Sequence, residues 1–185
     1  MPDLVATIDT SVLVSLQSAE LLGAVAVLFN RILVPVKVRQ ELKQGGERNQ
    51  TALRAIGEFA FFEHCDDYDQ ALVQLLLQTR KQLKKGRDEG EAEAVIQAAQ
   101  GTARMVLTDD ELGRDWARMH TRECHGTIWI CYHLRLNGFL IELRPYFLKM
   151  LQHRRRQPLP EMNQYLQELG ESPISPEEYS NYMKK

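Results

Sequence analysis

Short apolar runs alternate with stretches of helical periodicity in the first part of the chain. Residues 4–8 form an apolar run, and apolar side chains then recur at helical spacing over 12–16. A second run, 31–34, meets Pro35, which suits the first turn of a helix, and the periodicity continues over 38–42. The pattern predicts two successive units of strand, turn and helix.

The middle of the chain is predicted to be mostly helical. Helical periodicity covers residues 47–60, 67–83 and 89–100, whereas residues 61–64 suit a short extended piece. A basic stretch, Arg80 to Arg87, closes the second of these helices. The apolar face of that helix would be formed by Ala71, Leu72, Leu75, Leu76 and Leu83.

The next stretch repeats the strand and helix alternation. Residues 104–107 suit a buried strand, with a helix through 116–119 behind it, and further helices are expected over 126–136 and from Pro145 onward. Strands that alternate with helices imply a parallel sheet covered on both faces. We therefore predict an α/β fold for residues 1–152.

The last part of the chain differs in composition. Residues 153–185 contain several prolines, and Ser175, Pro176 and two glutamates resemble the start of a helix. We predict a C-terminal helical extension here. Its apolar side chains are expected to dock either on the body or on another subunit; they are Tyr179, Tyr182 and Met183.

Composition narrows the class of protein. The chain has 185 residues, 44% of them hydrophobic, which is enough for one domain with a sizeable core. Its net charge of -2 means that a phosphate-rich partner would need a local basic patch or bound metal. Three scattered cysteines match no disulfide framework, and we expect no signal peptide or membrane span. A cytoplasmic location fits best.

Acidic residues follow the predicted strands. Asp9 comes after the first strand, and Asp109 and Asp110 come after the strand 104–107, where open parallel sheets bind their ligands. Glu41 and Glu91 lie on helices near the same edge. Carboxylates about 4 Å apart repel by roughly 4 kcal/mol at an effective dielectric constant of about 20, so such a cluster needs protons or cations. Oxygen ligands suit Mg²⁺ or Mn²⁺.

Each acidic residue also has an ordinary interpretation. Asp9, Asp109 and Asp110 are of a type that commonly caps helices, and an isolated Glu41 would be a solvated helix residue. Helical periodicity favours Glu91 only slightly over its neighbour Glu93 as the residue that faces the site.

Other chemistry-bearing residues are weaker candidates. His120, Cys124 and His125 suggest zinc but have no matching second pair of ligands. The basic runs 80–87 and 153–156 could hold phosphates, although charge runs usually form solvated faces. The two tryptophans lie among helical apolar positions and are expected in the core rather than as base-stacking platforms; they are Trp116 and Trp129.

The four acidic stretches together resemble the successive motifs of PIN-domain proteins. They are Asp9-Thr10-Ser11, Val38 to Leu42, Gly90 to Val95, and Leu107 to Asp110. The closing stretch from His125 to Ile128, with Asn137 and Gly138, is similar to a subgroup near the VapC-type toxin ribonucleases. The resemblance covers about residues 4–151.

The resemblance implies a three-layer α/β/α sandwich with a parallel central sheet and an Mg²⁺- or Mn²⁺-dependent endoribonuclease. The implied catalytic residues are Asp9, Glu41, Glu91 and Asp110, and the implied metal ligands are Asp9, Glu91, Asp109 and Asp110, with the choice between the last two left open. Ser11 or Thr10 would orient the Asp9 carboxylate, and Thr108 would support the site. Glu91 departs from the Asp that toxin members carry at this position, which leaves the toxin identity open.

The resemblance and the general behaviour of such domains also suggest partners. We expect RNA as substrate, an antitoxin protein if the chain is a toxin, and a symmetric homodimer. The main alternative is a catalytically inert PIN-like module that binds RNA or a protein. A haloacid dehalogenase phosphatase needs a second Asp where this chain has Ser11, and a phospho-receiver domain lacks convincingly placed residues.

Overall fold

A parallel sheet forms the centre of the molecule. The computed structural model describes residues 4–78, 89–120, 123–155 and 157–184, and within them five strands are ordered β3-β2-β1-β4-β5. Every pair of neighbouring strands is parallel. The strands are β1 (Val5–Ile8), β2 (Arg31–Pro35), β3 (Phe62–Cys65), β4 (Met105–Leu107) and β5 (Cys124–His125).

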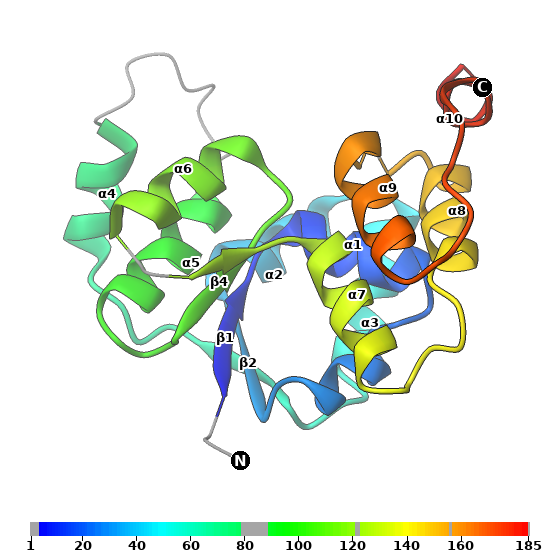
Figure 1. Cartoon of the computed structure of the whole chain (residues 1–185). Helices are drawn as coiled ribbons and strands as arrows, with labels where there is room; N and C mark the ends of the chain where they lie inside the picture. Colours follow the sequence, from blue (N-terminus) through cyan, green and yellow to red (C-terminus); the bar gives the residue numbers. More distant parts are fainter. Residues whose placement is uncertain (1–3, 79–88, 121–122, 156, 185) are drawn as a thin grey trace.

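Helices cover both faces of the sheet, so the predicted three-layer α/β/α architecture is confirmed (Figure 1). One face carries α4 (Gln70–Gln78), α5 (Glu89–Ala99) and α6 (Glu111–His120). The core on the other face is built with α1 (Thr10–Ser18), the 3-10 turn η1 (Gly23–Val27), α2 (Val36–Gln44), α3 (Glu47–Ile56), α7 (Thr127–Leu136), α8 (Arg144–Gln152) and α9 (Leu159–Glu168). The final helix is α10 (Pro176–Met183).

The two-residue period of the strands divides the core into two clusters. In β1, Ala6 and Ile8 face the larger cluster, whereas Val5 packs against the smaller one. Thr7 also faces the smaller cluster, where its buried hydroxyl donates to Gln97 of α5 at 2.7 Å. Side chains of β1 therefore contact both helical layers, as expected for the central strand.

The predicted apolar face of α4 is partly wrong. The structure buries Val73 and Leu76 but leaves Leu72 and Leu75 exposed by 40% and 58%. Helix α4 packs mainly against α5 at the outside of its layer, so only a narrow stripe of its surface is covered. The basic stretch 80–87 lies outside the described residues.

Two short elements had no clear sequence signal. Strand β5 contains two residues, Cys124 and His125, and its backbone pairs with β4. The turn η1 occupies Gly23–Val27, between the first helix and the second strand. Both are shorter than the window over which hydrophobic periodicity can be recognised.

The C-terminal helices dock on the body of the same chain. Met162 and Leu166 of α9 are fully buried in the larger core cluster. The Tyr179 hydroxyl of α10 donates to the Gln157 carbonyl at 3.0 Å, and Arg144 of α8 pairs with Glu178 at 2.7 Å. These contacts favour the body over another subunit as the docking surface. Among the described helices, none is long and apolar enough to cross a bilayer.

We expect Leu166→Ala in α9 to destabilise the whole domain, because truncation of a fully buried leucine costs about 2 to 5 kcal/mol. Urea unfolding followed by circular dichroism should show one transition, shifted to lower urea. The matched control is Gln167→Ala on the exposed side of the same helix, which should leave the midpoint almost unchanged. Two separate transitions, or an unchanged midpoint for Leu166→Ala, would show that α9 does not share its core with the rest of the domain.

Candidate active site

Acidic side chains gather at the carboxyl ends of β1 and β4. Asp9 directly follows β1, and Asp109 and Asp110 follow β4. After β1 the chain continues to β2 on one side, and after β4 it continues to β5 on the other side. A crevice is therefore expected between the carboxyl ends of β1 and β4. Glu41 reaches this region from α2, and Glu91 lies in the first turn of α5.

The Asp9 carboxylate is completely buried and held by several donors. It caps α1 by accepting from the Val12 amide at 2.9 Å, and it accepts from the Ser11 hydroxyl at 2.7 Å and from the Thr108 hydroxyl. Burial and, to a smaller extent, the charge of Asp109 raise the pKa of Asp9 to about 7, against the lowering effect of the hydrogen bonds. Asp9 is therefore fixed in position while its negative charge is poorly solvated.

Glu41 is held close to the start of α5. The Thr10 hydroxyl donates to its Oε2, and the Gly90 amide also donates to the carboxylate. A Cβ at position 90 would lie 3.0 Å from Glu41 Oε1, so glycine permits this close approach of the two helices. Burial raises the pKa of Glu41, and its Oε1 is buried without a hydrogen-bond partner.

Glu91, rather than Glu93, is coupled to Asp9. Burial, and after it the charges of Asp9, Glu41 and Asp110, raise the pKa of Glu91 to about 9. Its Oε2 is buried and has no hydrogen-bond partner. Glu93 instead accepts from the Lys37 amide at 2.8 Å. The charges of the other three predicted carboxylates therefore all act on Glu91.

The two neighbouring aspartates after β4 have different surroundings. Asp109 accepts from the Thr127 amide and hydroxyl at 2.7 and 2.6 Å, and from the Gln157 amide group at 2.7 Å. Asp110 is exposed and caps α6 by accepting from the Leu112 amide at 2.8 Å. Asp109 therefore ties β4 to α7 and to the C-terminal segment, whereas Asp110 is open to solvent.

Arg155 contacts helix α1 close to the acidic residues. Its Nε donates to the Ser15 hydroxyl and its Nη2 to the Ser11 carbonyl, both at 3.1 Å. Burial lowers the pKa of Arg155, against the charges of Asp109 and Asp9, which favour its charged form. The sequence marks Arg155 only as part of the basic run 153–156 and Thr127 only as part of the stretch His125 to Ile128. It does not mark Gln157 as a site residue, because no motif identifies a side chain that reaches the site from a distant segment.

The acidic residues that the structure describes carry oxygen atoms of the kind that bind a cation, but their side chains are not arranged as a complete set of metal ligands. Within the described ranges, no three carboxylate, imidazole or thiol side chains lie close enough together to hold an ion. The two buried, unpaired oxygens, Glu41 Oε1 and Glu91 Oε2, have lost water without gaining another partner. A hard divalent cation fits such donors better than zinc does. Neither His120, Cys124 nor His125 belongs to a metal-binding group.

Comparison with protein families identifies the fold family. A family model described as a PIN domain matches residues 5–171, which is most of the chain. The chain belongs to the PIN-domain family. Comparisons with curated proteins and with solved structures gave no match. The PIN-like resemblance is therefore confirmed, whereas the relation to VapC-type toxins stays a prediction.

A small hollow lies beside the acidic residues of this PIN domain, at the carboxyl end of β5. We call it the β5 hollow; it has a volume of about 260 Å³ and is lined by Arg114, Arg118, Cys124, His125, Gly126, Trp129 and Tyr165 among others. Burial raises the pKa of Cys124 to about 11, so its thiol stays protonated at neutral pH. The β5 hollow therefore offers binding groups rather than a cysteine nucleophile.

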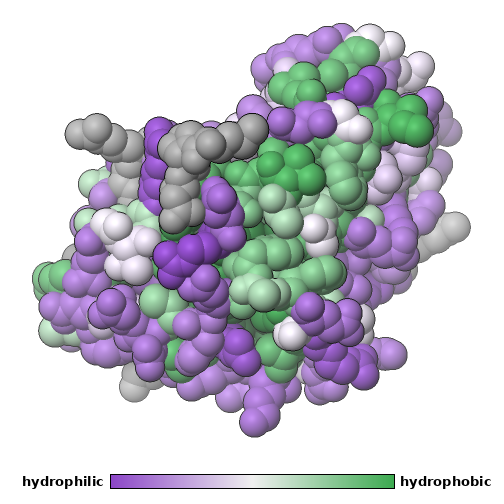
Figure 2. All heavy atoms as spheres, turned by 90° about the horizontal axis from the view of Figure 1, so that it is seen from below, coloured by the Kyte–Doolittle hydropathy of each residue, from purple (hydrophilic) through white to green (hydrophobic). Residues whose placement is uncertain are grey.

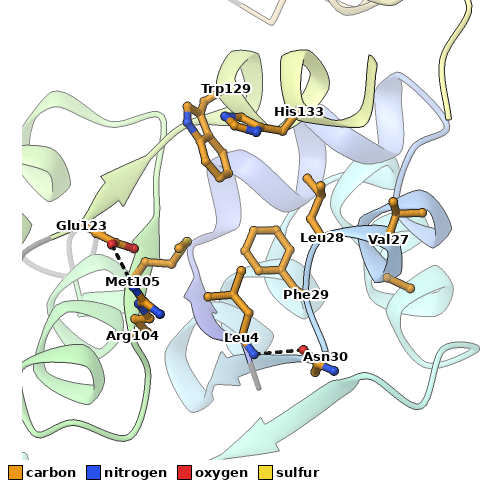
Figure 3. Close-up of a pocket in the computed structure, with 11 residues that line it drawn as sticks. Leu4, Val27, Leu28, Phe29, Asn30, Arg104, Met105, Glu123, Trp129 and His133 are labelled. Carbon is orange, nitrogen blue, oxygen red and sulfur yellow. Dashed lines mark hydrogen bonds and ion pairs between the residues drawn. The ribbon is translucent and has the colours of Figure 1, made fainter. Parts of the chain in front are cut away.

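A larger hollow lies at the opposite, amino ends of the strands. Its volume is about 480 Å³, and Figure 3 shows Leu4 and Phe29 facing Trp129 and His133 of α7 across it. Seen from the side on which β1 and β2 begin, apolar atoms gather across the middle of the molecule (Figure 2). This amino-end hollow lies away from the carboxylates.

The raised pKa values of Asp9 and Glu91 predict that the metal-free domain loses stability as the pH rises. In the unfolded chain these carboxyls have pKa values of about 4, so above this pH the folded state binds more protons than the unfolded state. Stability is then fully present below about pH 4. It falls as the pH rises through the folded pKa values of about 7 for Asp9 and about 9 for Glu91.

Asp9→Asn tests this origin of the pH dependence. In EDTA, urea unfolding between pH 5 and 8 should show a smaller loss of stability for Asp9→Asn than for the wild type, by up to about 1.4 kcal/mol per pH unit. Asp67→Asn, which changes an exposed aspartate, is the control and should follow the wild type. Equal pH slopes for Asp9→Asn and the wild type would show that Asp9 is already ionised at pH 5.

Proposed function

We propose that this PIN domain is an Mg²⁺- or Mn²⁺-dependent endoribonuclease. The observation that carries the proposal is the fully buried carboxylate of Asp9 at the carboxyl end of β1, together with two buried carboxylate oxygens, Glu41 Oε1 and Glu91 Oε2, that have no hydrogen-bond partner among the described residues. Protons or a cation must offset these negative charges at neutral pH. PIN domains have a nuclease-type fold, which supports a cation rather than protons as the functional partner.

The residues proposed to hold the metal are Asp9, Glu91 and Asp110, with Glu41 as a further carboxylate beside them. When bound, Mg²⁺ or Mn²⁺ would activate a water molecule for attack on phosphorus and offset the negative charge that builds on the phosphate. No side chain of the chain is required as a nucleophile.

The protein's own part is to keep these carboxylates in place. Ser11 and Thr108 fix Asp9 from two sides, and Thr10 fixes Glu41. Such hydrogen bonds orient the oxygen atoms before a cation arrives, which lowers the cost of assembling the site. Thr10 therefore acts on Glu41, and Ser11 acts on Asp9.

RNA is the proposed substrate because the β5 hollow places two arginines and several rings beside the acidic residues. A toxin role and an antitoxin partner stay predictions from the VapC resemblance, and a homodimer stays a prediction from the general behaviour of such domains. The alternative, an inert module that binds RNA or a protein, differs from the proposal in a single property: it would not bind manganese at the carboxylates.

Cleavage of a long single-stranded RNA tests the proposed activity. The wild type should cut this RNA when Mg²⁺ or Mn²⁺ is added and stop when EDTA removes the ion. Asp9→Asn should lower kcat/KM by at least about a hundredfold, because it removes the central carboxylate charge. Asp67→Asn is the matched control and should cut like the wild type. Equal cutting by the wild type and Asp9→Asn, or none by either, would contradict the proposal.

The different surroundings of Asp109 and Asp110 predict different defects. Asp110→Asn should lose Mn²⁺ affinity in calorimetry with little change in the urea midpoint, because Asp110 is exposed. Asp109→Asn should lower stability by about 1 to 3 kcal/mol, because it disrupts charged hydrogen bonds to Thr127 and Gln157. The reverse result, with manganese affinity lost in Asp109→Asn alone, would identify Asp109 as the ligand.

A further inference from the structure

A column of stacked rings ends at the β5 hollow. Trp129 stacks on His125 with ring centroids 3.9 Å apart and an interplanar angle of 16°, and the His133 ring lies 4.0 Å from Trp129, tilted by 39°. Figure 3 shows Trp129 and His133 side by side on α7. Among the described rings, Trp129 is the only one stacked on His125, so His125 ends the column inside the hollow.

Two arginines line the β5 hollow, together with Glu161, whose carboxylate lies 3.9 Å from Arg114. Arg114 and Arg118 lie one turn apart on α6, and both line the hollow. Arg114 is anchored, because its Nε donates to the Thr108 carbonyl at 3.2 Å. Arg118 is 70% exposed and has only a long contact with Asp115, at 3.5 Å, on its own helix. One arginine is therefore fixed, and the other remains able to contact a ligand.

The hollow borders directly on the acidic residues. A Cβ at Gly126 would lie 2.7 Å from Asp109 Oδ1 and 2.5 Å from an Arg114 nitrogen, so the carboxylate and the guanidinium meet at this glycine. Asp110 is the next residue, and it caps the helix that carries both arginines. A ligand in the hollow would therefore lie beside the proposed cleavage site.

The size and chemistry of the β5 hollow fit a small planar group attached to an anion. Its volume of about 260 Å³ is below the range of pockets for drug-sized ligands. Rings stack on nucleobases of any sequence, and arginines bind phosphate. The amino-end hollow is lined by a single arginine, Arg104, and lies away from the carboxylates of the site.

We propose that the β5 hollow binds one nucleotide of a single-stranded RNA next to the phosphodiester at the carboxylates. The base stacks on His125, and the attached phosphate contacts Arg118 and Arg114. This inference rests on the proposed nuclease function and adds to it a subsite for one nucleotide of the substrate. A base in the hollow also comes close to Trp129, which lines the same space.

Binding is best measured on the full chain carrying Asp9→Asn in EDTA, with a short fluorescein-labelled single-stranded oligoribonucleotide. The RNA should quench tryptophan emission, because Trp129 lines the hollow while Trp116, at 1% exposure, is shielded. Adding His125→Ala should weaken binding by about 5- to 150-fold, the range for loss of one base stack. His64→Ala, at an exposed position of β3, is the matched control and should not change the dissociation constant.

Arg118→Gln provides a second readout that a merely structural role would not change. Loss of one phosphate contact should reduce the slope of log K against log salt concentration by about 0.7. His125→Ala should leave this slope unchanged, because stacking releases no counterions. Arg54→Gln, which changes an exposed arginine of α3, is the matched control and should keep the parent slope. Arg118 is exposed, so this variant should fold even if His125→Ala does not.

The outcomes separate this inference from the proposed function. If the wild type cuts RNA with manganese while His125→Ala and Arg118→Gln keep the parent affinity, the subsite is wrong and the nuclease proposal stands. If the wild type cuts nothing but both variants lose affinity as expected, the subsite stands and the nuclease proposal fails. No binding of the oligoribonucleotide to the Asp9→Asn chain would overturn the subsite.

Discussion

The buried carboxylate of Asp9 is the constraint on which the rest of the site depends. It follows the central strand β1, it caps α1, and it accepts a hydrogen bond from Thr108 after β4, so two strands and a helix meet at one charge. Burial makes that charge costly, and Glu91 adds a second one beside it. The fold therefore concentrates negative charge where a parallel sheet opens to ligands.

The C-terminal segment helps to hold the acidic residues in place. Arg155 lies near Asp9 and Asp109 through the serines of α1, and Gln157 donates to Asp109 directly. The helices that follow are anchored in the same core as α1 by Met162 and Leu166. Residues far apart along the chain thus hold one acidic cluster, and the C-terminal helices contribute to its geometry as well as to packing.

The sequence predicts most of the sheet and the acids at its edge, because one apolar run ends directly before Asp9 and another directly before Thr108, Asp109 and Asp110. It cannot separate Asp109 from Asp110, since the turn after β4 decides which of two adjacent side chains points inward. The exposed Leu72 and Leu75 of α4 were missed because amphipathicity does not reveal how much of a helix its neighbours cover. Trp129 was expected in the core, yet it is half-buried and lines both hollows, unlike Trp116.

Helix α6 links the proposed chemistry to the proposed recognition. Asp110 accepts from the amides at the start of this helix, and Arg114 and Arg118 follow on successive turns toward β5. Arg114 also bonds to the carbonyl of Thr108, whose hydroxyl holds Asp9. A displacement of α6 would therefore move a carboxylate and both cations together. Asp110 and the two arginines are thus all placed by helix α6, without a loop between them. The helix therefore sets the distance between a phosphate bound at the arginines and the acidic cluster.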